Sequence, residues 1–144
     1  MMDKNFTMRE AISLLTQFCT PLGGCFPEEL EENLLVRRFV EAEYASLDEE
    51  HQYKYFINES GMDVLHPFAV IIASEFVVFI RKNGGECSMG GIKRWFADTY
   101  NLDDETADEI ANYFCNMLGH FNAEYKATWI HSSKFGNGYA IEKK

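Results

Sequence analysis

The sequence predicts a mainly α-helical domain that ends in a β-hairpin. Two observations lead to this prediction. Apolar residues recur at helical spacing through most of the chain, whereas near its end "WIHSSKF" and "YAIEKK" flank the glycine-rich "GNG". We expect about six helices. A chain of 144 residues with 47% hydrophobic content has the size and composition of one globular domain, so we predict a single domain over residues 1–144.

The N-terminal third predicts two helices and an irregular segment. In "TMREAISLLTQFC", Thr7 and Glu10 have the spacing of a capping box before an apolar series. "PEELEENLLVRRFVEAEYASL" predicts a second helix that begins at Pro27, because proline and glutamates are favoured in a first helical turn. For "DEEHQYKYFINESGMD" we expect a short helix and a loop, with a turn at "NESG".

The most apolar segment, "HPFAVIIASEFVVFIRKNGG", predicts a buried helix. Its β-branched residues are compatible with strands, but no turn residue divides the segment and it is too long for one strand. We expect the helix to begin near Pro67 and to stop at Gly84 and Gly85. Its polar side is predicted to hold Ser74, Glu75, Arg81 and Lys82. The apolar run from Phe68 to Ile80 is too short to span a bilayer, so we expect no membrane segment.

Two further helices are predicted before the hairpin. Ser88 is a candidate cap for a helix with an inward stripe of Ile92, Trp95 and Phe96. The next helix, entered through Asn101 or Asp103, has the strongest apolar periodicity in the chain and is predicted to be the longest. Its stripe consists of Ala107, Ile110, Ala111, Phe114, Leu118, Phe121 and Tyr125.

This order of helix, tight turn, helix and hairpin resembles that of a winged-helix DNA-binding domain over about the last 55 residues. The resemblance lies in the order of elements alone, without a residue motif. It implies that the helix after Asn101 would read DNA. That helix begins with carboxylates, however: Asp103, Asp104, Glu105, Asp108 and Glu109. Together with a net charge of −10, they would repel a phosphate backbone, so we expect no direct DNA binding.

No catalytic or cofactor motif is recognised in the sequence. Gly85 and Gly90 have the spacing of a phosphate-binding loop, but Gly91 and Ile92 stand where lysine and serine or threonine are required. The four cysteines and four histidines lack the spacing of paired metal ligands. We therefore expect a non-enzyme without a metal or cofactor. No secretory signal is visible, which predicts a cytoplasmic protein with four reduced thiols.

The function that remains is binding to another protein, because aromatic residues among charges, in segments that look partly exposed, are typical of a protein-binding surface. The candidate partner-binding residues are Asp104, Glu105, Asp108, Glu109, Tyr53, Tyr55, Trp129 and Phe135. A narrower hypothesis is an inhibitor that presents its acids to a basic nucleic-acid-binding groove, as phage anti-restriction and anti-CRISPR proteins do. The alternative is a winged-helix transcriptional regulator that binds nucleic acid through its hairpin, and a small-molecule enzyme is third.

Overall fold

The structure is a computed structural model that describes residues 6–144. The chain forms two compact units, of which the first ends at Phe68 and the second covers Ala69–Lys144. Helix α3 (Glu59–Lys82) supplies residues to both. The mainly α-helical prediction is confirmed, but the described residues form five α-helices rather than about six. One domain over residues 1–144 stays a prediction.

The first unit opens with α1 (Met8–Cys19), which begins as predicted. The Thr7 backbone N–H donates to Glu10 Oε1 at 2.9 Å, and the Glu10 N–H donates back to Thr7 Oγ1 at 3.1 Å. This capping box satisfies two amides that have no partner inside the helix. The buried face of α1 consists of Ala11, Ile12, Leu14, Leu15 and Phe18.

The long second helix predicted from Pro27 is wrong. The segment instead forms a 3₁₀ helix, η1 (Pro27–Glu31), then α2 (Leu34–Glu41), then strand β1 (Ala45–Asp48). Asn33 separates the two helices, because its side chain accepts a hydrogen bond from the Val36 N–H at 3.1 Å and so starts a new helix. Glu43, with φ of 65°, then turns the chain out of α2.

The short helix and loop predicted around residue 55 are also wrong. Residues Lys54–Ile57 form strand β2, which pairs antiparallel with β1 so that Ala45 lies opposite Ile57. The aromatic and β-branched residues of "KYFI" are typical of a strand. The predicted turn at "NESG" is the start of α3, because Asn58 Oδ1 accepts from the Gly61 N–H at 3.0 Å.

Helix α3 confirms one helix over residues 68–82 but begins at Glu59, eight residues before Pro67. Pro67 therefore lies inside the helix, where it has no N–H to donate to the carbonyl four residues earlier. With 24 residues, α3 is long and apolar enough to cross a membrane by length and composition, so the expectation that this segment is too short does not hold. We interpret it as a core helix, since Phe68, Ile72, Phe76 and Ile80 are fully buried.

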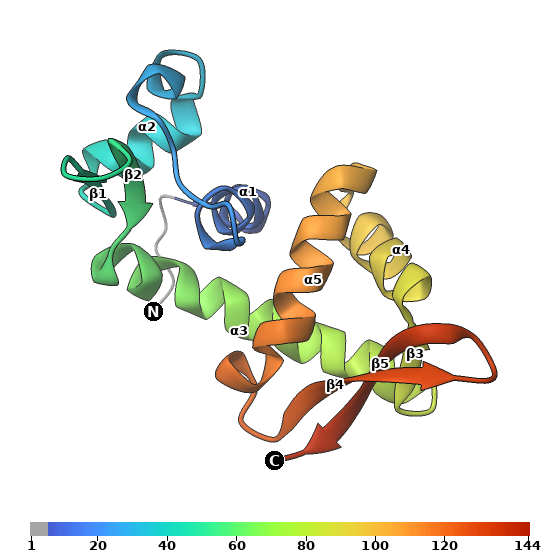
Figure 1. The fold of residues 1–144 in the computed structure, drawn as a ribbon. Coiled ribbons are helices and arrows are strands. Elements are labelled where there is room, and N and C mark those ends of the chain that lie inside the picture. Colours follow the sequence, from blue (N-terminus) through green and yellow to red (C-terminus); the bar gives the residue numbers. More distant parts are fainter. Residues whose placement is uncertain (1–5) are drawn as a thin grey trace. The chain divides into compact units, whose positions relative to one another are not determined.

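In the second unit, α3 is followed by strand β3 (Glu86–Ser88), α4 (Met89–Tyr100), α5 (Asp104–Phe121), β4 (Tyr125–Ser132) and β5 (Gly136–Lys143). The three strands form an antiparallel sheet in the order β3-β5-β4, and Figure 1 shows β4 and β5 as the C-terminal hairpin. The hairpin is therefore confirmed, whereas β3 was not predicted.

The hairpin turn lies at residues 133–135 rather than at the predicted "GNG". Ser132 pairs with Gly136, so the three residues of "GNG" belong to β5. Gly138 is a strand glycine for a steric reason: a Cβ there would lie 2.2 Å from the Cys87 backbone oxygen. Glycine at this position permits the close approach of β3.

The predicted caps of α4 and α5 are confirmed. Ser88 Oγ accepts from the Gly91 N–H at 3.0 Å, and Asp103 Oδ1 accepts from the Thr106 N–H at 2.7 Å. Asn101 ends α4 in a left-handed conformation. Helix α5 has 18 residues and is shorter than α3, so it is not the longest helix. Its predicted apolar stripe is buried through Phe121, while Tyr125 begins β4.

Candidate functional site

The exposed face of α5 carries a row of four polar residues that we call the α5 stripe: Glu105, Glu109, Asn112 and Asn116. Their positions i, i+4, i+7 and i+11 place them on one side of a helix with 3.6 residues per turn. The opposite side packs into the core through residues such as Ile110 and Phe114. The stripe changes character along its length, with carboxylates in the first half and amides in the second.

The acids at the start of α5 divide into two groups. Asp103 caps the helix, and the hydrogen bond from the Thr106 backbone lowers the pKa of its carboxyl group. Asp108 forms an ion pair with Lys93 of α4. Asp104, Glu105 and Glu109 are exposed and belong to no ion pair in the described part of the chain. These three acids, which we call the free acids, are therefore available to a partner.

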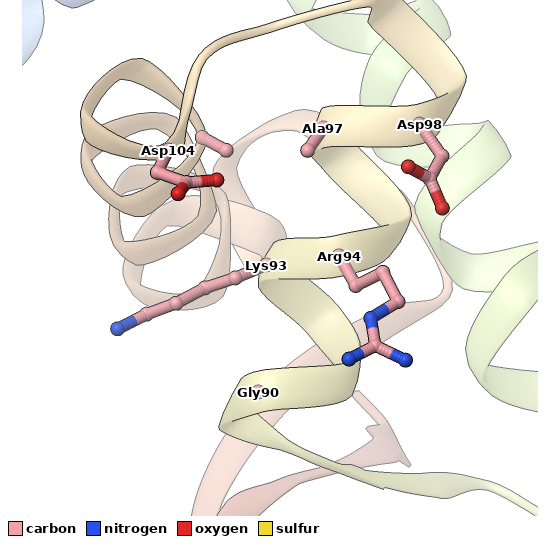
Figure 2. A pocket seen from close by; sticks show the side chains of 7 residues that line it. Gly90, Lys93, Arg94, Ala97, Asp98 and Asp104 are labelled. Atoms are coloured by element: carbon pink, nitrogen blue, oxygen red, sulfur yellow. The ribbon is translucent and has the colours of Figure 1, made fainter.

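A groove of about 390 Å³ lies between α4 and the start of α5. Figure 2 shows Lys93, Arg94 and Asp98 on α4 and Asp104 on the neighbouring helix α5, with Lys93 extending on the side of α5. The groove is lined by Gly90, Lys93, Arg94, Ala97, Asp98, Asp104 and Ala107. Because two cations and two carboxylates share its wall, the groove favours neither an anion nor a cation by net charge.

The hairpin brings an aromatic residue next to the α5 stripe. Trp129 is 53% exposed, and its ring lies edge-on to that of Tyr139, with 5.2 Å between the centroids. The Tyr139 hydroxyl donates to Asn116 Oδ1 at 3.5 Å. Tyr139 thus connects Trp129 to the stripe, and we call Trp129 and Tyr139 the aromatic pair. Tyr139 was missed because its role depends on the register that places it opposite Trp129.

Phe135, another predicted site residue, lies half-buried in the hairpin turn. Its ring lies beside Gly138, where a Cβ would meet the ring at 2.9 Å. Nearby, His131 Nδ1 lies 2.9 Å from Asn137 Oδ1 across the two strands. Phe135 therefore packs on the hairpin itself and offers less surface to a partner than Trp129 does.

Tyr53 and Tyr55 belong to the first unit. Tyr53 is 57% exposed in the turn before β2 and has a positive φ of 48°. Tyr55 is half-buried, and its backbone pairs with that of Cys25 at 2.8 and 2.9 Å. Of this predicted pair, Tyr53 has the greater exposed surface, whereas Tyr55 supports the small sheet.

The thiols have the environment of structural cysteines. All four are free. Burial raises the pKa of Cys25 to about 11 and that of Cys115 to about 12, and it also raises the pKa of Cys87. Thiols with raised pKa values are protonated at neutral pH and are weak nucleophiles. Among the described residues, no group of three or more His, Cys, Asp or Glu side chains could hold a metal ion.

No family model, curated protein or solved structure matches this chain. Its function is therefore inferred from the chemistry and placement of its own residues. The features that face solvent together in the second unit are the free acids, the α5 stripe and the aromatic pair.

Proposed function

We propose that this protein is a non-catalytic binding module that recognises a basic surface of another protein. The observation that supports this most directly is the set of free acids on the exposed start of α5. Carboxylates without a cationic partner attract a basic surface and speed the encounter with it. The aromatic pair at the far end of the α5 stripe supplies apolar contact area, which commonly contributes most of the binding energy at an interface.

The arrangement of the second unit supports this choice of surface. Its order of helix, strand, helix, helix and hairpin, with β3 paired to β5, is like that of a winged-helix domain. In that comparison α5 corresponds to the helix that reads DNA, and the β4–β5 hairpin corresponds to the wing. We propose that the surface used by such domains for nucleic acid is used here for a protein, since a fold does not fix its function.

A nucleic-acid-binding regulator is the second candidate, and two observations favour it. The first is the winged-helix-like order of elements, and the second is the exposed position of Asn112 and Asn116, because amides can recognise base edges. The net charge of −10 and the free acids oppose it, since binding to phosphates depends on lysine and arginine contacts. We therefore rank it below protein binding.

A narrower form of the proposal is an inhibitor whose carboxylates take the place of phosphates in a basic nucleic-acid-binding groove. The free acids Glu105 and Glu109 lie one turn apart on the same exposed face of α5. A row of carboxylates at this spacing fits a groove lined with lysine and arginine. The acidity and small size of the chain support this form in the same way.

The experiment compares two charge-reversal variants. One changes Asp104, Glu105 and Glu109 to lysine, and the control changes Glu28, Glu31 and Glu32 of the first unit to lysine. Both add the same charge at exposed positions. The probe is a fluorescein-labelled 12-residue peptide of alternating arginine, lysine and serine, and binding is measured by anisotropy in 50 and 150 mM salt.

We expect the native protein to bind this peptide more weakly as salt rises, because exposed charges are screened within about 8 Å at 0.15 M. The α5 variant should lose most of the binding, and the first-unit control should retain most of it. Equal losses in the two variants would show that net charge alone attracts the peptide, and the proposed surface would then be wrong.

A further inference from the structure

We propose that the partner presents an arginine that stacks on Trp129, within an extended segment that runs along the α5 stripe towards the free acids. This inference rests on the proposed function and specifies the chemistry of the partner. On this inference, the aromatic pair gives the surface its preference for a segment with arginine over a segment with lysine.

Trp129 is an exposed aromatic surface on which a planar group could stack. Tryptophan is usually well buried, yet this one retains 53% of its surface on an edge strand. The edge-on ring of Tyr139 supports the indole from one side. Since Tyr139 also contacts Asn116, the indole is held at a defined place beside α5. An ordered, exposed indole is a suitable surface for a planar group.

The negative charge near Trp129 indicates which planar group would stack on it. The free acids favour a cationic partner, and the two common protein cations differ in how they meet an indole. Guanidinium is planar and weakly hydrated, so it stacks on an aromatic face and still donates to carboxylates, whereas the lysine ammonium is a strongly hydrated point charge. An arginine therefore gains more from Trp129 than a lysine does.

The spacing along α5 determines what else the segment carries. Glu109 lies seven positions before Asn116, which is about 10 Å at 1.5 Å per residue, and Glu105 lies about 16 Å away. An extended chain advances about 3.3 Å per residue. Side chains of an extended chain alternate between its two faces, so the basic residues that face α5 together with the stacked arginine stand at even positions from it. Basic residues four and six positions along, about 13 and 20 Å from the arginine, would therefore come within side-chain reach of Glu109 and Glu105 in turn.

The side-chain amides of Asn112 and Asn116 could form hydrogen bonds with the backbone of such a segment. Asn112 donates its Nδ2 to the Asp108 carbonyl at 2.9 Å, which fixes its side chain on the exposed face. The Asn116 amide retains its own N–H donors while its oxygen accepts from Tyr139. Unstacked nucleic acid bases could also stack on an exposed indole, but their phosphates would then meet the free acids. The charges favour the arginine-bearing segment.

The test uses the full chain with Trp95→Phe, so that Trp129 is the sole tryptophan of the two in the sequence. Three probes are titrated at 50 mM salt: a peptide with arginines at positions 1, 5 and 7 among glycines and serines, the same peptide with lysines, and a 12-nucleotide oligothymidine. Each is titrated against this protein by Trp129 fluorescence and by anisotropy of a label on the probe. Trp129→Ala and the control Val78→Ala, which shortens a 51% exposed residue of α3, are then compared by anisotropy.

We expect the arginine peptide to bind about fivefold more tightly than the lysine peptide, which is the preference that one partly desolvated cation–π contact provides. It should quench Trp129, and Trp129→Ala should reduce its affinity to that of the lysine peptide. Val78→Ala should change neither affinity. Circular dichroism checks that each variant is folded.

Other outcomes separate this inference from the proposed function. Equal affinities for the two peptides, unaffected by Trp129→Ala but reduced by charge reversal on α5, would overturn the arginine inference and leave the proposed function standing. Failure of both peptides to bind would overturn both. Binding of oligothymidine that exceeds that of the arginine peptide and requires Trp129 would assign the aromatic pair to nucleic acid instead.

Discussion

The Lys93 ammonium on α4 and the Asp108 carboxylate on α5 form an ion pair that joins the two helices. Their side chains are 41% and 46% exposed, so water screens much of the attraction. The pair also removes Asp108 from the set of unpaired acids that we propose a partner recognises. Among the described residues, the acids at the start of α5 that neither cap the helix nor pair with a cation are therefore Asp104, Glu105 and Glu109.

Replacing Lys93 with methionine should release that fourth acid. We expect the free energy of unfolding to fall by no more than about 1 kcal/mol, as is usual for an exposed ion pair. Association with the basic peptide should become faster because the surface gains an unpaired carboxylate. Urea unfolding and stopped-flow fluorescence measure the two quantities. Lys82→Met, which removes an equal charge from α3, is the control, and an equal gain in rate there would contradict a local effect.

The pH dependence of the α5 cap follows from Asp103. Its pKa is lowered from 3.8 by the hydrogen bond from Thr106, so the folded state favours the carboxylate. The contribution to stability is complete above the unfolded-state pKa and is lost as pH falls through the lower, folded-state value. Asp103→Ala should therefore lower the Tm at pH 7 but have little effect at strongly acidic pH.

Asp103→Asn provides the matched control, because the asparagine oxygen can accept the same hydrogen bond without titrating. Its Tm at pH 7 should be close to that of the native protein. The difference in Tm between Asn and Ala variants should persist at low pH, where the native protein approaches the alanine variant. Differential scanning calorimetry across this range makes the comparison.

The assignment of the buried face of α3 is tested by comparing an aspartate substitution on that face with one on the exposed face. Ile72 is fully buried, so Ile72→Asp places an unpaired carboxylate in the core at a cost of several kcal/mol, comparable to the roughly 5–15 kcal/mol of a whole domain. We expect that variant not to fold. Val78→Asp, at a 51% exposed position of the same helix, should fold normally. Near-ultraviolet circular dichroism reports whether each variant is folded. A folded Ile72→Asp variant and an unfolded Val78→Asp variant would show that the buried face is misassigned.

Local signals in the sequence were sufficient for much of the helical structure. Thr7, Ser88 and Asp103 predict helix starts because a cap depends only on residues three positions away. The apolar periodicity of α5 predicts its buried face because this pattern also depends only on residues that are close in the sequence. Gly84 and Gly85, with φ of 82° and 91°, end α3 where predicted.

Strands β1, β2 and β3 were missed because their stability comes from pairing with residues outside the segment itself. The three residues of β3 become a strand only by pairing with β5, where Cys87 lies opposite Tyr139. The start of α3 was placed too late because Pro67 resembles a first-turn proline, although the apolar helix extends beyond it on both sides. Likewise, neither Tyr139 beside Trp129 nor Lys93 beside Asp108 could be read from spacing along the chain.

Glycines around β3 give a further prediction. A Cβ at Gly138 would lie 2.2 Å from the Cys87 oxygen, a backbone atom that cannot move without disturbing the sheet. Gly138→Ala should therefore destabilise the protein and weaken the β3–β5 pairing. Gly90→Ala is the contrast, because nothing lies within 4 Å of that position on α4. There we expect no loss of stability and a gain below the roughly 1 kcal/mol of an interior helix position, because Gly90 lies in the first turn of α4. Urea unfolding that ranks the two variants the other way would contradict the placement of β3.

We propose that the exposed start of α5, with the free acids, binds protein and not DNA. A direct measurement of DNA binding tests this most simply. A labelled 20-base-pair duplex of mixed sequence is titrated with the native protein at 0.15 M salt, and anisotropy is recorded. The experiment is repeated with a pool of random duplexes, from which any bound sequences are recovered. We expect no binding up to about 10 µM protein, since phosphate contacts release counterions only when lysine and arginine make them, and here free acids occupy the surface. Sequence-dependent binding tighter than about 1 µM, beyond the range of non-specific contacts, would contradict the claim and establish the nucleic-acid-binding alternative.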